Sequence, residues 1–442
     1  MQALASFNEG LFQYLDVSPT PFHAVTEAVK QLSSAGFEEL KEADAWALKA
    51  GKNYYITRNA SCLIAFRYAN NQWAEKSCRF FGSHCDSPCL KLKPNAEVIE
   101  NNYLKFGVEV YGGVLLNPWF DRDLSLAGRV FVETETQESV GVLINFKRAV
   151  AIIPSLAIHL DREANQNRSI NSQKDILPIM MQVDTTIDKK TQRSLDTILL
   201  AELKQAYPEL KAKRVLDFEL SFYDVQKATY VGLNSDFICS ARLDNLLSCY
   251  VGLQALIHAQ KKQNSLLIIN DHEEVGSQSA QGAQGTFLKS VLERICHMED
   301  KGGEAFARCL SSSLFISADN AHGVHPNFAD KHDKNHGPIL NGGPVIKMNA
   351  NQRYATNSLT STYFKKLSEK ASIQTQSFVM RTDMTCGTTI GPITSAVLGV
   401  QTVDVGVPTF AMHSIRETAG NKDAFSLYQI AKLFFEDEKV VG

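Results

Sequence analysis

Acidic residues and histidines follow directly after three apolar runs of the sequence. The groups are CRFFGS before His84-Cys85-Asp86, SLLIIN before Asp271-His272-Glu273-Glu274, and SSLFISA before Asp319-Asn320-Ala321-His322. The apolar runs have the length of buried strands, and in open α/β sheets ligands bind beyond the carboxyl ends of the strands. Because imidazole and carboxylate groups are zinc ligands, the pattern indicates a metal centre at one edge of a sheet.

Two further residues extend this candidate set. Asp244 lies in SARLDNLLS just before a predicted helix, and His413 lies in AMHS after the apolar run around Asp404. Glu273 and Glu274 are adjacent, and neighbouring loop residues point in different directions. One of them could therefore bind a metal while the other accepts a proton from a water molecule.

Each of these groups also has an ordinary structural interpretation. Asp244 could be a helix N-cap, His413 a structural histidine, and the Glu-Glu pair a solvated surface pair. The argument for a metal centre is that five such groups occur in order, each at the end of an apolar run.

Motifs of other chemistries are missing from the sequence. It contains no GxSxG elbow, no P-loop and no HExxH. Gly276, Gly282 and Gly285 have the wrong spacing for a dinucleotide-binding fingerprint. Cys386 in MTCGTTIG shows no partnered histidine, and its Gly-rich setting favours a tight backbone turn.

The nine cysteines are scattered and include no CxxC pair. Their odd number and apolar surroundings favour buried, reduced thiols. Cys85 and Cys89 lie near His84, which leaves a thiolate zinc site as an alternative, although structural zinc sites usually pair cysteines at tighter spacing.

Composition describes an ordinary globular chain. Its 442 residues suffice for two or three domains, and a formal net charge of -3 gives no broad basic surface for nucleic acid or anionic lipid. No run reaches the ~20 apolar residues that span a bilayer, and the N-terminus lacks the pattern of a signal peptide. We therefore expect a cytoplasmic protein with no nucleic-acid or membrane partner.

Hydrophobic periodicity predicts the elements that carry these residues. An amphipathic helix should open the chain and end near Pro19 and Pro21, which break helices. The predicted strands are 61–68, 78–84, 103–113, 126–135, 139–146, 151–160, 215–225, 265–271 and 311–320. The predicted later helices are 244–262, 284–300 and 357–373, and residues 161–175 should form an exposed loop.

The order of these elements predicts two domains. Strands that alternate with helices indicate an α/β fold with a mixed, mostly parallel sheet covered by helices on both faces. We expect this catalytic domain to comprise residues 1–91 and 234–442. A β-rich domain of residues 92–233 would be inserted in its middle.

Eight segments of the chain strongly resemble the aspartyl aminopeptidase family of cocatalytic zinc peptidases. They are GSHCDSPCLKLKP, YGGVLLNPWFDRDLSLAGRV, SARLDNLLSCYVGLQAL, NDHEEVGSQSAQGA, SADNAHGVHPNF, GGPVIKMNANQRYATN and DMTCGTTIGP with AMHSIRE. The match runs over nearly the whole chain, in family order. It implies the zinc-peptidase type of α/β fold, with the inserted domain serving as a dimerisation or lid domain.

The resemblance implies a role for each candidate residue. Two zinc ions per subunit would share Asp244, with His84 and Asp319 completing one site and Glu274 and His413 the other. Mn²⁺ or Co²⁺ can occupy such sites as well. The remaining roles are general base for Glu273, orientation of the His84 ring for Asp86, and substrate contact for His159, His322, Lys347 and Tyr354.

The implied activity is removal of N-terminal acidic residues, Asp and then Glu, from peptides. One zinc would bind the free α-amine, and Lys347 would pair with the side-chain carboxylate of the first residue. Members of the family form tetrahedral dodecamers that enclose their active sites, which implies a homo-oligomer here. One departure is Cys85, where the family usually has a small hydroxyl residue; this position should not bind metal, but it leaves the site more oxidisable.

His159 is far in sequence from every proposed ligand. The pattern alone favours a core or edge-strand histidine, whereas the resemblance predicts that His159 completes the active site of a neighbouring subunit.

Two other functions stay open. A different dizinc hydrolase, such as a carboxypeptidase or deacylase, would need a cation aimed at a C-terminal carboxylate. A catalytically silent scaffold would have lost Glu273 or a ligand, yet all are present.

Overall fold

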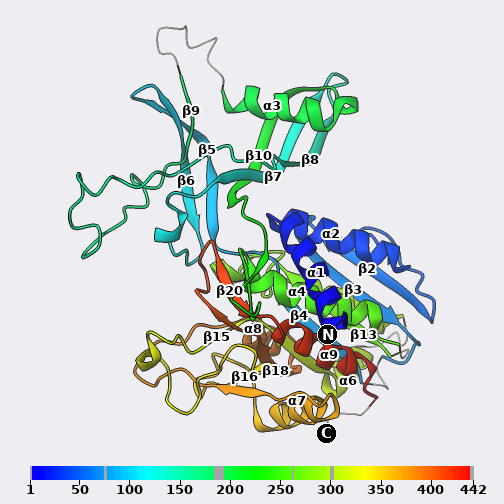
Figure 1. The fold of residues 1–442 in the computed structure, drawn as a ribbon. Coiled ribbons are helices and arrows are strands. Elements are labelled where there is room, and N and C mark those ends of the chain that lie inside the picture. Colours follow the sequence, from blue (N-terminus) through cyan, green and yellow to red (C-terminus); the bar gives the residue numbers. More distant parts are fainter. Residues whose placement is uncertain (1, 74–76, 184–193, 261–262, 299–302, 439–442) are drawn as a thin grey trace. The chain divides into compact units, whose positions relative to one another are not determined.

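A computed structural model describes residues 2–73, 77–183, 194–260, 263–298 and 303–438, which belong to two compact units (Figure 1). The first unit comprises Met1–Asp86, Ala228–Met412 and Glu417–Gly442, and the second comprises Ser87–Lys227 and His413–Arg416. The expected boundaries, 91/92 and 233/234, therefore differ from those of the units. The reason is pairing, because the strand that begins at Cys89 belongs to the second unit's sheet and the strand that begins at Thr229 belongs to a sheet of the first.

A nine-stranded mixed sheet forms the centre of the first unit. In spatial order its strands are β1 (Glu38–Glu39), β2 (Lys52–Arg58), β3 (Cys62–Tyr68), β13 (Ser265–Asn270), β4 (Arg79–His84), β14 (Leu314–Ala318), β18 (Gln401–Gly406), β16 (Val345–Lys347) and β17 (Gln376–Phe378). The central neighbours β13, β4, β14 and β18 run parallel, whereas β3 and β16 pair antiparallel with this group. The predicted α/β fold is confirmed.

Helices cover this sheet on both faces. They are α1 (Gln2–Val17), α2 (Pro21–Ser34), α4 (Leu243–His258), α5 (Phe287–His297), α6 (Glu304–Ser312), α7 (Ser358–Lys370), α8 (Ile390–Leu398) and α9 (Asp423–Glu436). Successive strand residues face opposite sides. Thus Phe81 and Leu267 join the core with α1, α2, α4 and α9, while Phe80 and Leu266 join the core with α5, α6 and α8.

A smaller five-stranded sheet brings together segments that flank the candidate residues. Its order is β11 (Thr229–Val231), β12 (Phe237–Ser240), β20 (Glu417–Gly420), β19 (Pro408–Phe410) and β15 (Ala321–His322). Sequence periodicity did not predict it, because its strands are only two to four residues long and such runs carry little pattern.

The second unit is built on a six-stranded antiparallel sheet. Its elements are β8 (Ser139–Asn145), β7 (Leu124–Thr134), β10 (Ala212–Asp224), β5 (Cys89–Glu100), β6 (Tyr103–Tyr111) and β9 (Ile179–Gln182), with α3 (Leu195–Ala206) and the short 3₁₀ turns η1 (Asn117–Trp119) and η2 (Pro208–Leu210). The helix α3 packs on this sheet through Leu199 and Leu203 (Figure 1). Sequence periodicity did not predict α3, because residues 92–233 were assigned to a β-rich domain.

One predicted strand of the second unit is wrong. Of residues 151–160, only Ala151 and Ile152 make isolated bridges, and a turn follows. Pro154 lacks a backbone N–H and cannot donate to a strand partner. The polar stretch 161–175 consists of turns and irregular backbone, and most of its residues are exposed, as expected.

In the described part of the chain, no helix is both long and apolar enough to cross a membrane.

Candidate metal centre

The carboxyl ends of three parallel strands carry most of the candidate residues. His84 is the last residue of β4, and Asp319 follows β14, where its N–H donates to the Val405 carbonyl (2.9 Å). Glu273 and Glu274 lie in the 3₁₀ turn η3 (Glu273–Val275) just after β13. Because β13, β4 and β14 are parallel neighbours, these ends meet at one edge of the sheet.

The His84 ring lies at the centre of a carboxylate cluster. Its Nε2 is 3.5 Å from Asp244 Oδ1, 3.6 Å from Asp319 Oδ1 and 3.9 Å from Glu273 Oε2. The ligand atoms of His84, Asp244 and Asp319 all lie within 4.8 Å of one another, and so do those of His84, Glu273 and Glu274. This is a set of one imidazole and four carboxylates, the ligand types that zinc accepts, in which His84, Asp244 and Asp319 are buried and the two glutamates are half-buried.

The protonation of the two glutamates reflects this crowding. Burial raises the pKa of Glu273 to about 8, with further increases from Asp319 and Asp86. Burial, followed by the charge of Asp244, raises the pKa of Glu274 well above its usual range. Without a cation the cluster therefore retains protons, and a divalent metal ion would displace them. The residues fit a metal centre on this ground.

The pKa values of His84 and Asp319 move in opposite directions. Burial disfavours the charged His84 ring, but hydrogen bonds to Asp244, Asp319 and Asp86 outweigh it and raise its pKa well above the usual value. Burial alone would raise the pKa of Asp319, yet the charges of Lys347 and His84 outweigh it and lower that pKa.

Asp86 connects two of the strand ends. The Nδ1 atom of His84 lies 3.1 Å from the Asp86 carbonyl oxygen and 3.4 Å from Asp86 Oδ1. The two carboxylate oxygens of Asp86 also accept the backbone N–H groups of Glu273 and Glu274, each at 3.1 Å. Asp86 therefore lies beside the imidazole, as predicted, and also holds the turn η3, a contact that was not predicted.

Asp244 is held by a residue that sequence reasoning did not single out. Its backbone N–H donates to Glu417 Oε2 (2.8 Å), and Glu417 is buried on β20. Asp244 and Asn245 have non-helical backbone angles at the start of α4, so the regular part of that helix begins after them. Glu417 is the last residue of the AMHSIRE motif, and this position in a family motif could have indicated it as a site residue.

Lys347 pairs with the cluster from within the sheet. This last residue of β16 is buried, and its Nζ donates to Asp319 Oδ2 (3.2 Å) and to the Asn320 carbonyl (3.1 Å). An ammonium group has three N–H donors, so two are engaged by these contacts. Lys347 thus holds the Asp319 oxygen opposite to the one that faces His84.

Two other predicted substrate contacts lie along a row of rings. Lys347 Nζ is 5.1 Å from the centroid of the Tyr354 ring, Tyr354 is 6.4 Å from Phe378, and Phe378 is 5.8 Å from His322. Burial, then the neighbouring Cys386, raises the pKa of the Tyr354 phenol. Phe378 therefore lies near both the buried Tyr354 and the exposed His322.

Comparison with known proteins decides which family has this arrangement. The family model of the aminopeptidase I zinc metalloproteases (M18) matches residues 14–435. The chain belongs to the M18 aminopeptidases. It is therefore a zinc-dependent hydrolase of the aminopeptidase class.

Relatives of this M18 aminopeptidase match it over its whole length. A probable M18 family aminopeptidase 2 of Pseudomonas aeruginosa (strain UCBPP-PA14) is 52% identical over 437 residues, 99% of each chain. A protein of the same name from Azotobacter vinelandii is 52% identical over 429 residues, 97% of each chain.

Solved structures give the same family. Ape4, in a complex with Nbr1, is 37% identical with a TM-score of 0.94, over 98% of this chain and 86% of that chain. The S. cerevisiae mApe1 dodecamer is 28% identical with a TM-score of 0.83, over 99% of this chain and 97% of that chain.

The cysteines of this M18 chain stay outside the metal cluster. The Cys85 thiol donates to the carbonyls of Ser61 (3.2 Å) and Asn270 (3.3 Å). No cysteine belongs to a potential metal-binding group among the described residues, so the thiolate alternative is wrong for this part of the chain. All nine cysteines are among the described residues, and none of them forms a disulfide.

Two predicted site residues of the M18 chain belong to its second unit. The His413 Nδ1 atom lies 3.1 Å from the Gly113 carbonyl oxygen, and the Leu115 N–H donates to the His413 carbonyl (3.1 Å). His159 is exposed in a turn, so it is neither a core nor an edge-strand residue.

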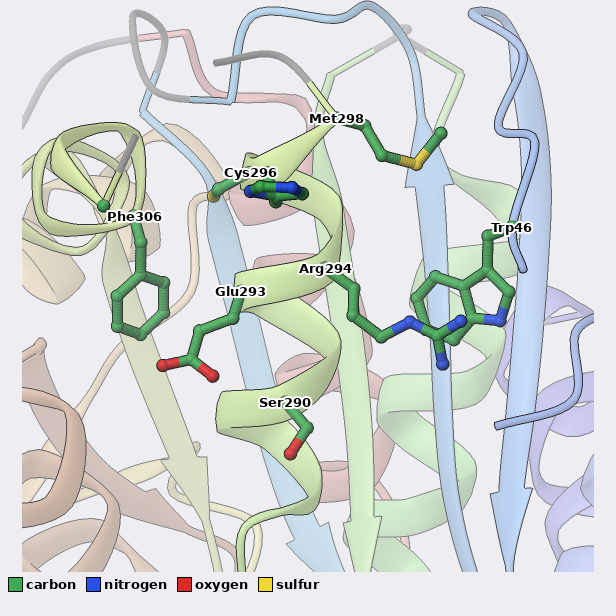
Figure 2. Close-up of a pocket in the computed structure, with 9 residues that line it drawn as sticks. Trp46, Ser290, Glu293, Arg294, Cys296, Met298 and Phe306 are labelled. Atoms are coloured by element: carbon green, nitrogen blue, oxygen red, sulfur yellow. The ribbon is translucent and has the colours of Figure 1, made fainter. Parts of the chain in front are cut away.

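A large pocket of the first unit is separate from the cluster. It has a volume of about 540 Å³ and is lined by Trp46 and by residues of α5 and α6 (Figure 2). The Arg294 guanidinium lies 3.6 Å from the centroid of the Trp46 ring and donates to the Glu42 carbonyl (2.8 Å). None of its lining residues is a candidate ligand, so this pocket is not the active site.

Proposed function

We propose that this M18 enzyme removes acidic residues, aspartate above glutamate, from the N-termini of peptides with two zinc ions per subunit. The observation that carries the proposal is one buried cation, Lys347, directly beside the carboxylate-imidazole cluster. In a chain with a formal net charge of -3, such a local cation is what can attract an acidic side chain.

We assign one metal ion to His84, Asp244 and Asp319, whose ligand atoms converge. The second ion is assigned to Asp244, Glu274 and His413, with Asp244 shared. The effect of Asp244 on the pKa of Glu274 supports their proximity. His413 directs Nδ1 to a backbone carbonyl, an arrangement common in metal-binding histidines. Mn²⁺ or Co²⁺ could replace zinc.

Bound zinc ions would polarise the scissile carbonyl and make a water molecule more acidic. Glu273 accepts the proton of the attacking water and delivers it to the leaving amine. Asp86 holds the backbone of Glu273 in place and so fixes the starting point of its side chain.

The remaining residues bind the substrate. The third N–H of Lys347 pairs with the side-chain carboxylate of the first residue, and Tyr354 and His322 line its path. His159 completes the site of a neighbouring subunit. The exposed apolar residues Leu156, Ile158 and Leu160 around it support a contact surface in that loop.

We propose that the chain forms a homo-oligomer, a tetrahedral dodecamer, in which the second unit serves as the dimerisation or lid domain. The dodecamer described for S. cerevisiae mApe1 supports this assembly. We also propose a cytoplasmic location, since nine cysteines without a disulfide suit a reducing compartment.

A peptide panel tests the proposed specificity. Peptides that differ only in the first residue, Asp, Glu, Leu or Lys, are compared with the N-acetylated Asp peptide. The expected order is Asp, then Glu, then Leu and Lys, with no cleavage of the acetylated peptide. Equal cleavage of Asp and Leu peptides rules out acidic selection, and cleavage of the blocked peptide favours a deacylase or carboxypeptidase.

A further inference from the structure

We propose that a second, smaller pocket of the first unit binds the side chain of the peptide's second residue and selects a large apolar residue there. The inference rests on the proposed aminopeptidase function and extends it to the position after the scissile bond. The pocket has a volume of about 270 Å³. Its apolar walls are Phe378, Met380, Met384, Phe410 and Met412.

The pocket adjoins the metal centre along the backbone. His322 lines it and stands three residues after the candidate ligand Asp319. At 3.8 Å or less per residue, the Cα atoms of these two residues are at most roughly 11 Å apart. Phe378, another wall, pairs in strand register with Lys347, whose ammonium holds Asp319. A bound peptide can therefore reach the pocket within one or two residues of the centre.

Lys347 and Tyr354, which are proposed to contact the first residue, do not line this pocket. Its wall residue Phe378 has its ring centroid 6.4 Å from Tyr354 and 5.8 Å from His322, so the pocket lies next to the site proposed for the first residue. An aminopeptidase substrate has no residue before its first one. A pocket next to the first-residue site can therefore take only a later residue, and in an extended peptide the next side chain points to the other side.

The size and lining of the pocket define the side chain it accepts. An apolar cavity of about 150 Å³ can hold benzene, so about 270 Å³ gives room for Leu, Met or Phe. Of the charged lining residues, Arg381 is paired with the Asp383 carboxylate, and Lys331 and Asp333 carry opposite charges. A basic second residue is disfavoured because its ammonium group would lose hydration against the apolar walls.

Arg381 keeps the pocket in shape by joining two loops. Its guanidinium donates to the carbonyl of Asp330, in the 3₁₀ turn η4 (Ala329–Lys331), and to the carboxylate of Asp383 (2.9 and 2.6 Å). The pocket is therefore built by fixed contacts between η4 and the segment after β17.

Tripeptides Asp-Xaa-Gly with Ala, Leu, Phe or Lys as the second residue test the proposal. The kcat/KM values for Leu and Phe should exceed that for Ala by about 10-fold, the scale of burying a few methylene groups, and Lys should give the lowest value. Met384→Trp would fill the pocket, and the Leu-to-Ala ratio should fall to about 2 or less. Lys331→Glu should raise the relative kcat/KM for Lys.

Met298→Trp is the matched control, because Met298 lines the separate pocket of Figure 2 and is 43% exposed against 44% for Met384. It should leave the Leu-to-Ala ratio unchanged. A flat second-residue series in the unmodified enzyme, or equal changes of the ratio in both Trp variants, overturns the proposal. Varying the first residue at a fixed second residue tests the acidic specificity separately, so either conclusion can fail while the other holds.

Discussion

At the scale of single residues, Asp319 shares its carboxylate between two functions. One oxygen faces His84 Nε2 at 3.6 Å, and the other accepts from Lys347 at 3.2 Å. Strand ends and residue types were enough to predict Asp319 as a site residue, whereas Lys347 was predicted only from the family resemblance. Their pairing was not predictable, because the two residues approach each other only through the order of β14, β18 and β16 in the sheet.

The division of roles between the adjacent glutamates gives the first prediction. Glu273→Gln keeps the size of the side chain but cannot accept a proton, so turnover should fall by at least ~10²-fold, the scale of general-base loss. Its zinc content should stay unchanged. Glu274→Gln is the matched variant and should lose zinc. Elemental analysis and steady-state kinetics on both proteins check this. If Glu273→Gln lost zinc and Glu274→Gln kept it, Glu273 would be the metal ligand and Glu274 the general base.

Lys347 is predicted to act on specificity. Lys347→Leu leaves the substrate carboxylate without a buried partner, a penalty of a few kcal/mol. Cleavage of Asp peptides should therefore fall by ~10²-fold or more while weak cleavage of Leu peptides survives or rises.

Lys347→Arg serves as the charge-keeping control for this variant and should retain part of the acidic preference. Zinc content is measured in both proteins, because Lys347 also holds Asp319. An unchanged Asp-to-Leu ratio in Lys347→Leu would exclude Lys347 as the selector.

At the scale of elements, the strand ends of the metal centre could be predicted and the short connecting pieces could not. The apolar runs of the sequence predicted β4, β13 and β14, because each of these strands is buried along its whole length. The contact between β20 and the start of α4, made by Glu417, joins residues 173 positions apart. Such a contact leaves no local pattern in the sequence.

Asp86 tests how one side chain positions two elements. Asp86→Ala removes both acceptors of the η3 turn and the carboxylate beside His84. Zinc affinity or turnover should fall by about 10- to 100-fold. Asp86→Asn keeps one acceptor oxygen and should lose less of both. Chelator competition measures the affinity, and equal behaviour of the Ala variant and the unmodified enzyme would show that η3 needs no anchor.

At the scale of the whole molecule, the sequence predicted a domain interrupted by an insertion, but the predicted boundaries lie five to six residues after those of the two compact units. β5 starts within the GSHCDSPCLKLKP motif, so the motif that carries His84 and Asp86 also opens the second unit. Likewise the short segment His413–Arg416 belongs to the second unit although both flanks belong to the first. Motifs read along the chain cannot show such a change of unit.

His159 carries the prediction about assembly. If His159 completes a neighbouring subunit's site, the isolated monomer should be nearly inactive. His159→Ala and Glu273→Ala should each be inactive, but co-expression should restore part of the activity, because some sites then pair an intact Glu273 with an intact neighbouring His159. Activity of mixed assemblies is the measurement. Mixtures that co-assemble and stay inactive would show that His159 does not act between subunits.

The metal content of the active enzyme tests the central claim most directly. Zinc is removed with a chelator and returned stepwise while bound metal and cleavage of an Asp peptide are measured together. We predict two zinc ions per chain at full activity, and fewer than two in Asp244→Asn because both ions share that carboxylate. Full activity with a single ion per chain, or two ions retained by Asp244→Asn, would contradict the two-metal centre.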